Sequence, residues 1–167
     1  MSNGQIVISA LSSNVDKENF DCGNESLNNY IKCLASQDVK RKISVVYTAT
    51  VGGDFVGFYS LSAISVEAIE LPKNIAKKLP RYPISAAIIG RLAVDINSQG
   101  NGLGGILLID AIKKSIKAGE FLAIHSIIVD AKDESAKKFY EHYGFLPLQT
   151  SPMRLFLSVE TAKEIMK

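Results

Sequence analysis

Four glycines occupy six consecutive positions where an apolar run gives way to a long amphipathic segment. Residues 99–105 read Gln-Gly-Asn-Gly-Leu-Gly-Gly. Residues 85–94 before them predict a buried strand, and residues 103–118 after them repeat apolar side chains at helical spacing. The first amides of a helix lack backbone partners, and glycines let the backbone approach an anion closely. The sequence therefore predicts a phosphate-binding loop between a strand and a helix.

The identity of the phosphate ligand is not fixed by the loop alone. Gly100-x-Gly102-x-x-Gly105 also satisfies the dinucleotide-binding fingerprint, and Asp130 ends the next predicted strand. In that fingerprint the first glycine follows directly on its strand, whereas here residues 95–99 intervene. The loop also lies in mid-chain, with too little chain for two mononucleotide-binding halves. A nucleoside triphosphate loop is disfavoured because no Gly-Lys-Ser/Thr follows.

The remaining pattern predicts one α+β domain over residues 1–167, with a mixed, mostly antiparallel sheet flanked by helices. Gly52-Gly53-Asp54 between two strand-like runs indicates a β-hairpin. Asn24, Asp133 or Ser135 can cap helices, and Gly144 can end the later one. The expected strands are residues 5–11, 44–51, 55–65, 85–94, 122–130 and 154–158. The expected helices are residues 24–41, one or two turns within 71–79, then 103–118 and a short helix ending at Gly144.

Composition narrows the function classes. The start of the sequence lacks a basic region followed by an apolar run, and no stretch approaches the ~18 apolar residues of a membrane span, so we expect a soluble, cytoplasmic protein. Cys22 and Cys33 lack the spacing of a disulfide framework or a metal site, and no metal is expected. A formal net charge of +2 is too small to predict nucleic-acid binding from bulk electrostatics. Short basic segments are most simply explained as solvated helix faces.

Three elements in order resemble the GNAT superfamily of acetyltransferases. Gln99, Gly102 and Gly104 fill its pyrophosphate loop, Arg/Gln-x-x-Gly-x-Gly/Ala. Residues 92–95, Leu-Ala-Val-Asp, match the preceding strand, whose backbone amides pair with the pantetheine arm in that family. Residues 139–145, Phe-Tyr-Glu-His-Tyr-Gly-Phe, match its closing helix. The resemblance implies a GNAT fold that binds acetyl-CoA through Leu92, Ala93, Val94, Gln99, Gly100, Asn101, Gly102, Leu103, Gly104 and Gly105.

Two positions qualify this expectation. Many relatives carry Arg or Lys where this chain has Asn101, so one phosphate contact is lost while the backbone amides remain. Tyr140 resembles the general acid of these enzymes, whose hydroxyl lies near the thioester sulfur. Its helical stripe with Ala136, Phe139 and Tyr143 would by itself indicate core packing, and the Phe-Tyr-x-x-x-Gly-Phe context favours the catalytic role.

No general base for the amine is evident. His125 lies within the predicted apolar strand, and His142 falls on the outer face of its helix, so structural roles are expected for both. An acceptor amine of low pKa, such as that of an α-amino ester, can lose its proton to water without a dedicated base.

Further segments resemble one subfamily, the acetyltransferase toxins of bacterial type II toxin–antitoxin systems. The match covers nearly the whole chain and is carried by residues 20–24 with 27–28, 57–62, 79–83, 90–95 and 129–132. It implies acetylation of the free α-amine of aminoacyl-tRNA, which blocks translation. It also implies a homodimer and neutralisation by a ribbon-helix-helix antitoxin.

Under this resemblance the basic segments become candidates for contacts with the tRNA backbone. The candidates are Lys40, Arg41, Lys77, Lys78, Arg81 and Arg91. Two other functions stay open at this point. One is a metabolic or protein N-acetyltransferase acting on a small amine or a lysine, and the other is a non-catalytic protein that binds acetyl-CoA as a regulatory ligand.

Overall fold

The strands of the computed structural model, which describes residues 4–167, form one seven-stranded sheet in the order β1-β2-β3-β4-β5-β7-β6. Pairs β1–β2, β2–β3, β5–β7 and β6–β7 are antiparallel, and β4–β5 is parallel. The predicted mixed, mostly antiparallel sheet is therefore confirmed. The strands are β1 (Ile6–Ala10), β2 (Val45–Val51), β3 (Asp54–Val66), β4 (Ile84–Val94), β5 (Ser126–Asp130), β6 (Leu146–Pro147) and β7 (Arg154–Ser158).

Two compact units divide the chain. Unit 1 contains the residues up to Ser62 together with Gly90–Ala111, and unit 2 contains Ala63–Ile89 and Ile112–Lys167. Strands β3 and β4 and the long helix α4 (Leu103–Ala118) contribute residues to both units. The two units are thus interleaved in sequence, and neither is a separate stretch of chain.

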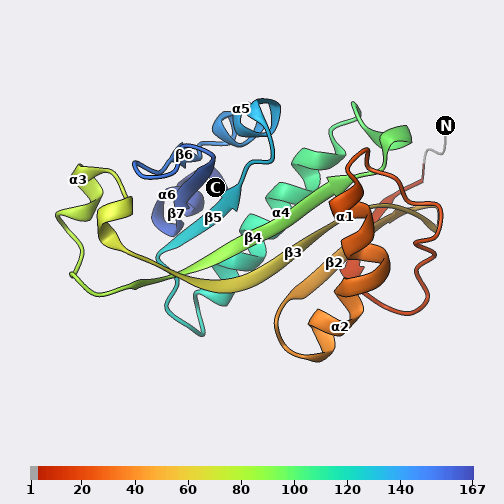
Figure 1. Ribbon diagram of the computed structural model, residues 1–167, viewed down its shortest axis with the longest axis horizontal. Helices are drawn as coiled ribbons and strands as arrows, with labels where there is room; N and C mark the ends of the chain where they lie inside the picture. Colours follow the sequence, from red (N-terminus) through yellow and green to blue (C-terminus); the bar gives the residue numbers. More distant parts are fainter. Residues whose placement is uncertain (1–3) are drawn as a thin grey trace. The chain divides into compact units, whose positions relative to one another are not determined.

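Unit 1 holds the N-terminal helical segment, which Figure 1 draws in orange. It consists of α1 (Glu25–Asn29), the π-helical turn η1 (Tyr30–Leu34) and α2 (Ala35–Lys40). The Asn24 side chain caps it by accepting a hydrogen bond from the Leu27 amide at 3.1 Å, as its residue type predicts. Its buried face packs with three strands around one apolar cluster of Phe20, Cys22, Tyr30, Ile31, Ala35, Val46, Phe58 and Ala93.

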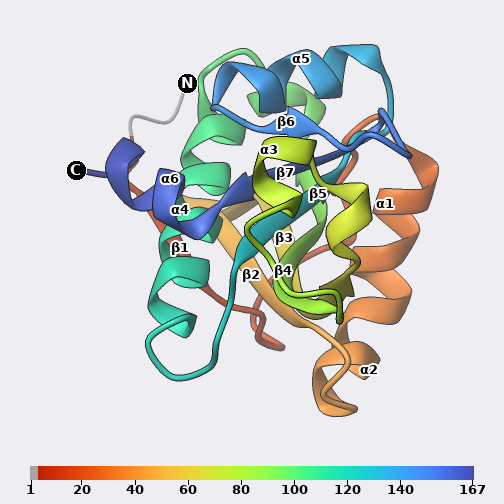
Figure 2. The ribbon, with the colours of Figure 1, turned by 90° about the vertical axis from the view of Figure 1, so that its left-hand side faces the viewer.

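Unit 2 is built around β5, β7 and two short helices. Helix α5 (Glu134–His142) is capped by Asp133, whose carboxylate accepts from the Ala136 amide at 2.8 Å. Helix α6 (Val159–Ile165) follows directly on β7 (Figure 2), and Ser158 caps it. The connection between β3 and β4 contributes η2 (Ala68–Glu70) and α3 (Lys73–Ala76). The core of this part consists of Val66, Leu71, Ala86, Ile128, Leu148 and Phe156.

One predicted strand begins later than its apolar pattern indicated. Residues 122–125 lie outside β5, which starts only at Ser126, so His125 precedes the strand rather than lying within it. The reason is the turn after α4, which leaves Phe121 and Leu122 78% and 74% exposed. The backbone of His125 still pairs at both groups, since its amide donates to Ser85 O and its carbonyl accepts from the Val159 amide.

Candidate active site

The glycine loop of unit 1 needs glycine at two of its positions. After β4 the chain makes a short turn, η3 (Ile96–Ser98), and Gly100 and Gly102 then adopt φ values of +85° and +80°. L-residues rarely adopt this left-handed region. Both glycines are exposed, and a Cβ atom at either would meet nothing within 4 Å. The loop therefore has the backbone conformation and the free space that a close approach to a phosphate requires.

Helix α4 begins at the end of this loop. Its first helical backbone bond runs from the Ile106 amide to Gly102 O at 3.1 Å. The amides of residues 103–105 precede that bond, so they have no partner within the helix, and the helix dipole adds partial positive charge at this end. This donor set fits an anion such as the diphosphate of a coenzyme.

The Gln99 side chain has a structural role in the loop. Its side-chain amide nitrogen donates to Val94 O at 2.9 Å and to Cys22 O at 3.2 Å. Asp95 makes a second link to the same turn, because its carboxylate accepts from the Asp21 amide at 3.2 Å as well as from the Asn97 amide. The Gln99 side chain thus ties the glycine loop to residues 21–22, and this anchoring was not predicted from the sequence.

A close approach of strand and helix fixes the start of α4 in unit 1. A Cβ atom at Gly57 on β3 would lie 2.9 Å from both Ala93 O on β4 and Leu107 Cδ1 on α4. Two residues further along β3, the Tyr59 hydroxyl donates to the Asp110 carboxylate at 2.5 Å. Burial and the Asp110 carboxylate both raise the Tyr59 pKa, so the hydroxyl keeps the proton it donates. Helix α4 thus lies close against β3, and the hydrogen bond from Tyr59 to Asp110 joins the two.

Tyr140 lies on α5 in unit 2 and is buried. Its ring packs edge-on against Phe139 and Phe145, with centroid distances of 5.3 and 5.9 Å. Gly144, at φ +97°, reverses the chain so that Phe145 returns against Tyr140. The Phe-Tyr-x-x-x-Gly-Phe pattern is therefore the local geometry that holds the Tyr140 ring.

The environment of Tyr140 keeps its hydroxyl protonated. Burial is the larger cause, and together with the negative charge of Asp130 it raises the Tyr140 pKa to about 12. A neutral phenol at physiological pH can donate a hydrogen bond to a developing thiolate. Because a thiol has a pKa of about 8.5, complete proton transfer from Tyr140 is uphill, and hydrogen bonding is its useful contribution.

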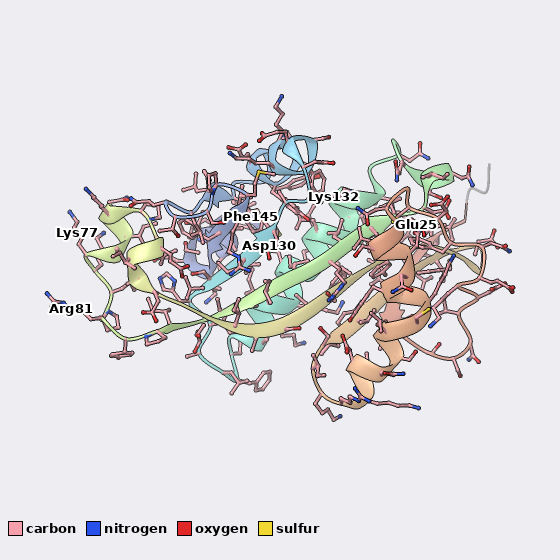
Figure 3. The ribbon with its side chains drawn as sticks, viewed as in Figure 1. Glu25, Lys77, Arg81, Asp130, Lys132 and Phe145 are labelled. Atoms are coloured by element: carbon pink, nitrogen blue, oxygen red, sulfur yellow. The ribbon has the colours of Figure 1, made fainter. Side chains whose placement is uncertain are left out.

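Asp130 itself is held by an ion pair that sequence reasoning missed. Asp130 and Arg154 are register partners on β5 and β7, and the guanidinium donates to both carboxylate oxygens, at 2.7 and 2.9 Å. This bidentate pairing raises the Arg154 pKa. Figure 3 labels Asp130, at the end of β5, and Phe145, which follows α5. The two residues of the ion pair meet only because of the register between β5 and β7, so no local sequence pattern predicts it.

The two histidines show no arrangement typical of a general base. His125 contacts Ser126 Oγ through Nδ1 at 2.6 Å, and burial lowers its pKa. His142 is exposed, with its ring against Tyr143. No group of three or more His, Cys, Asp or Glu side chains that could hold a metal ion occurs within residues 4–167.

The six basic candidates fall three to each unit. In unit 1, Lys40 and Arg41 are exposed at the end of α2, and the Arg91 guanidinium stacks 3.6 Å above the Tyr30 ring. The Tyr30 hydroxyl in turn donates to Asp38 at 3.1 Å. In unit 2, Lys77, Lys78 and Arg81 are all exposed in the connection between β3 and β4, where Figure 3 shows Lys77 and Arg81 pointing outward.

Comparison with known proteins identifies the class of this fold and site. The family described as acetyltransferase (GNAT) domain matches residues 42–147. The chain belongs to the GNAT acetyltransferases, which confirms the fold and the enzyme class expected from the glycine loop and the Phe-Tyr motif.

Relatives within the family are acetyltransferase toxins. A tRNA-acetylating toxin of Mycobacterium tuberculosis is 32% identical over 150 residues, which are 90% of each chain. The structure of AtaT complexed with acetyl-methionyl-tRNAfMet is 29% identical, with a TM-score of 0.91 over 98% of this chain and 100% of that one. A mutant AtaT toxin bound to acetyl-CoA and the C-terminus of the antitoxin AtaR is 26% identical, with a TM-score of 0.83 over 96% and 97%. The resemblance to the toxin subfamily is therefore confirmed.

Proposed function

We propose that this chain transfers the acetyl group of acetyl-CoA to the α-amine of an aminoacyl-tRNA, and that it thereby acts as a translation-blocking toxin. The observation that carries the proposal is the likeness to AtaT over nearly the whole of both chains, because that protein is complexed with the acetylated product acetyl-methionyl-tRNA. The relative named tRNA-acetylating toxin supports the same substrate class.

The glycine loop would bind acetyl-CoA in this reaction. The amides of residues 103–105, which have no partner within the helix, and the exposed glycines Gly100 and Gly102 suit its diphosphate. We propose that Asn101 and Leu103 also contact the coenzyme and that Gln99 holds the loop in the shape that binds it. We further propose that the backbone of residues 92–94 pairs with the pantetheine arm. The coenzyme supplies an acetyl group activated as a thioester.

Tyr140 is the proposed general acid. The amine nitrogen attacks the thioester carbonyl carbon, the new C–N bond forms, and the C–S bond breaks. The Tyr140 hydroxyl donates a hydrogen bond to the departing thiolate. The amine loses one proton to water and the thiolate takes one proton from water, so the protons balance. The electron pair of the C–S bond leaves with sulfur, so charge develops where Tyr140 donates.

The wider biology follows from the same family likeness. We propose that residues 1–167 act as one acetyltransferase domain, that the protein forms a homodimer in the cytoplasm, and that a ribbon-helix-helix antitoxin neutralises it. An antitoxin is bound to the relative AtaT, which supports this partner class. None of the helices within residues 4–167 is long and apolar enough to cross a membrane.

Incubation with labelled acetyl-CoA and total tRNA, either charged or deacylated, tests the proposal. We expect label on the aminoacyl group of charged tRNA and none on deacylated tRNA. Label on a small amine or a protein lysine instead would favour the metabolic or protein acetyltransferase. Coenzyme binding without transfer to any amine would favour a regulatory acetyl-CoA-binding protein. Growth arrest on expression, relieved by the antitoxin, is the expected cellular result.

Replacing Lys40 and Arg41 together with alanine is expected to raise the KM for charged tRNA and leave acetyl-CoA binding unchanged. Each phosphate contact contributes about one to the salt dependence of binding, so the slope of log K against log salt should fall by about two. Lys113 and Lys117, exposed on α4, form the matched control because the same charge is removed. Equal slopes in both double variants would exclude Lys40 and Arg41 from the tRNA surface.

A further inference from the structure

The connection between β3 and β4 in unit 2 has apolar side chains that pack into the core and basic side chains that are exposed. Leu71, Ile75 and Leu79, spaced by four residues, pack into the apolar cluster of this unit. The basic side chains between and after them, Lys73, Lys77, Lys78 and Arg81, are exposed. The sequence contains no acidic residue from Leu71 to Ile89, so these four cations are not neutralised locally. Their surface suits a polyanion.

Tyr82 adds an aromatic face to this basic surface. Its side chain is 70% exposed, and the flanking Pro80 and Pro83 stiffen the backbone on both sides. Of the Phe and Tyr side chains in residues 4–167, only Tyr82 and Phe121 are exposed. Phe121 follows an acidic residue, Glu120, whereas Tyr82 follows Arg81. An exposed aromatic ring in the same segment as several cations is the combination that binds unpaired nucleotides.

The same unit contains the proposed general acid, and a series of interactions leads from the residue before the basic connection to it. Just before the basic connection, the backbone carbonyl of Glu70 accepts a hydrogen bond from the backbone amide of Gln149 at 3.1 Å. The Glu70 carboxylate separately contributes to the raised pKa of Arg154. Arg154 pairs with Asp130, whose charge acts on Tyr140. Glu70, which precedes the basic connection, is therefore linked through Arg154 and Asp130 to the surroundings of Tyr140.

We infer that Tyr82, together with Lys77, Lys78 and Arg81, forms a docking surface for the unpaired 3′ end of tRNA, with a base stacked on the Tyr82 ring. The inference rests on the proposed function, because the amine to be acetylated is attached to that end. The cations contact phosphates and give no sequence preference, while the ring accepts any base through its π face. Tyr82 thus orients the strand that carries the substrate amine.

Binding of deacylated tRNA to the full chain, with and without its unpaired 3′ nucleotides, tests the inference. Tyr82→Ala should weaken binding of intact tRNA by about ten-fold, the effect of losing one stacked base. Trimmed tRNA should bind the wild type and Tyr82→Ala equally. Tyr82→Phe keeps the ring and should bind as the wild type does, and Phe121→Ala controls for loss of an exposed aromatic ring.

The possible outcomes distinguish a failure of this inference from a failure of the proposed function. If Tyr82→Ala binds intact tRNA as tightly as the wild type does, the inference is wrong. It is also wrong if the substitution weakens binding of trimmed tRNA as much as it weakens binding of intact tRNA. Label transfer to charged tRNA by the wild type, with no effect of Tyr82, would leave the proposed function intact. Conversely, Tyr82-dependent binding of intact tRNA without any label transfer would overturn the proposed function and support the surface. Loss of antitoxin neutralisation alone in Tyr82→Ala would assign the surface to a protein and overturn the inference.

Discussion

Tyr140→Phe is expected to lower kcat by about a hundred-fold or more, the usual contribution of a positioned acid, with little change in acetyl-CoA affinity. Only the hydroxyl is removed. The edge-on contacts of the ring with Phe139 and Phe145 are made by carbon atoms and survive the change. Steady-state kinetics with charged tRNA, beside direct measurement of acetyl-CoA binding, would separate turnover from affinity.

Tyr143→Phe is the matched control for this prediction. Tyr143 ends the same helix, is half-buried, and contacts Phe139 at a centroid distance of 5.3 Å. The same atom is therefore deleted from a similar aromatic setting. A kcat unchanged in Tyr140→Phe, or lowered equally in both variants, would remove Tyr140 from the chemistry.

Gly102→Val should raise the KM for acetyl-CoA by about ten-fold or more and should also lower the free energy of unfolding. A β-branched residue at φ +80° costs about 1–3 kcal/mol of backbone strain, and relief of that strain would distort the loop. Urea unfolding and acetyl-CoA titration measure the two effects separately.

Gly53→Val provides a comparison at a second glycine of positive φ. Gly53 adopts φ +88° in the turn between β2 and β3, and a Cβ atom there also meets nothing within 4 Å. The backbone strain in Gly53→Val should therefore be similar to that in Gly102→Val, but Gly53 lies in a hairpin turn and outside the glycine loop. We expect a comparable loss of stability with acetyl-CoA affinity preserved. Equal losses of affinity in both variants would argue against phosphate binding by the glycine loop.

The features predicted correctly from sequence depend on residues close together in the chain. Gly102 and Gly119 bracket α4, and its predicted limits, residues 103–118, are those observed. Asn24 and Asp133 cap the helices that their residue types indicated. The glycine loop and the Phe-Tyr motif likewise lie within short windows, so a single sequence was enough to find them.

The features that were missed depend on contacts between distant residues. The ion pair of Asp130 with Arg154 requires the register of β5 and β7, and the anchoring of Gln99 requires residues 21–22 to meet the glycine loop. The late start of β5 at Ser126 is set by packing. Helix α6 was not predicted either, although Ser158 at its N-cap and the Glu, Ala and Lys residues after it are a local helix signal. The substrate proposal rests on family likeness, because the residues alone left the acceptor amine open.

The link between Gln99 and Cys22 bears on how the protein folds as it is synthesised. The two residues are 77 positions apart, and Asp95 and Asp21, which make the neighbouring link, are 74 apart. Contacts of such separation form late, because closing the intervening loop costs entropy before the contact compensates for it. The glycine loop can therefore take its final shape only once the first strand–helix region has docked onto β4. A nascent chain therefore lacks a formed glycine loop until well over half of its residues have left the ribosome. That ribosome belongs to the translation machinery that the finished protein is proposed to block.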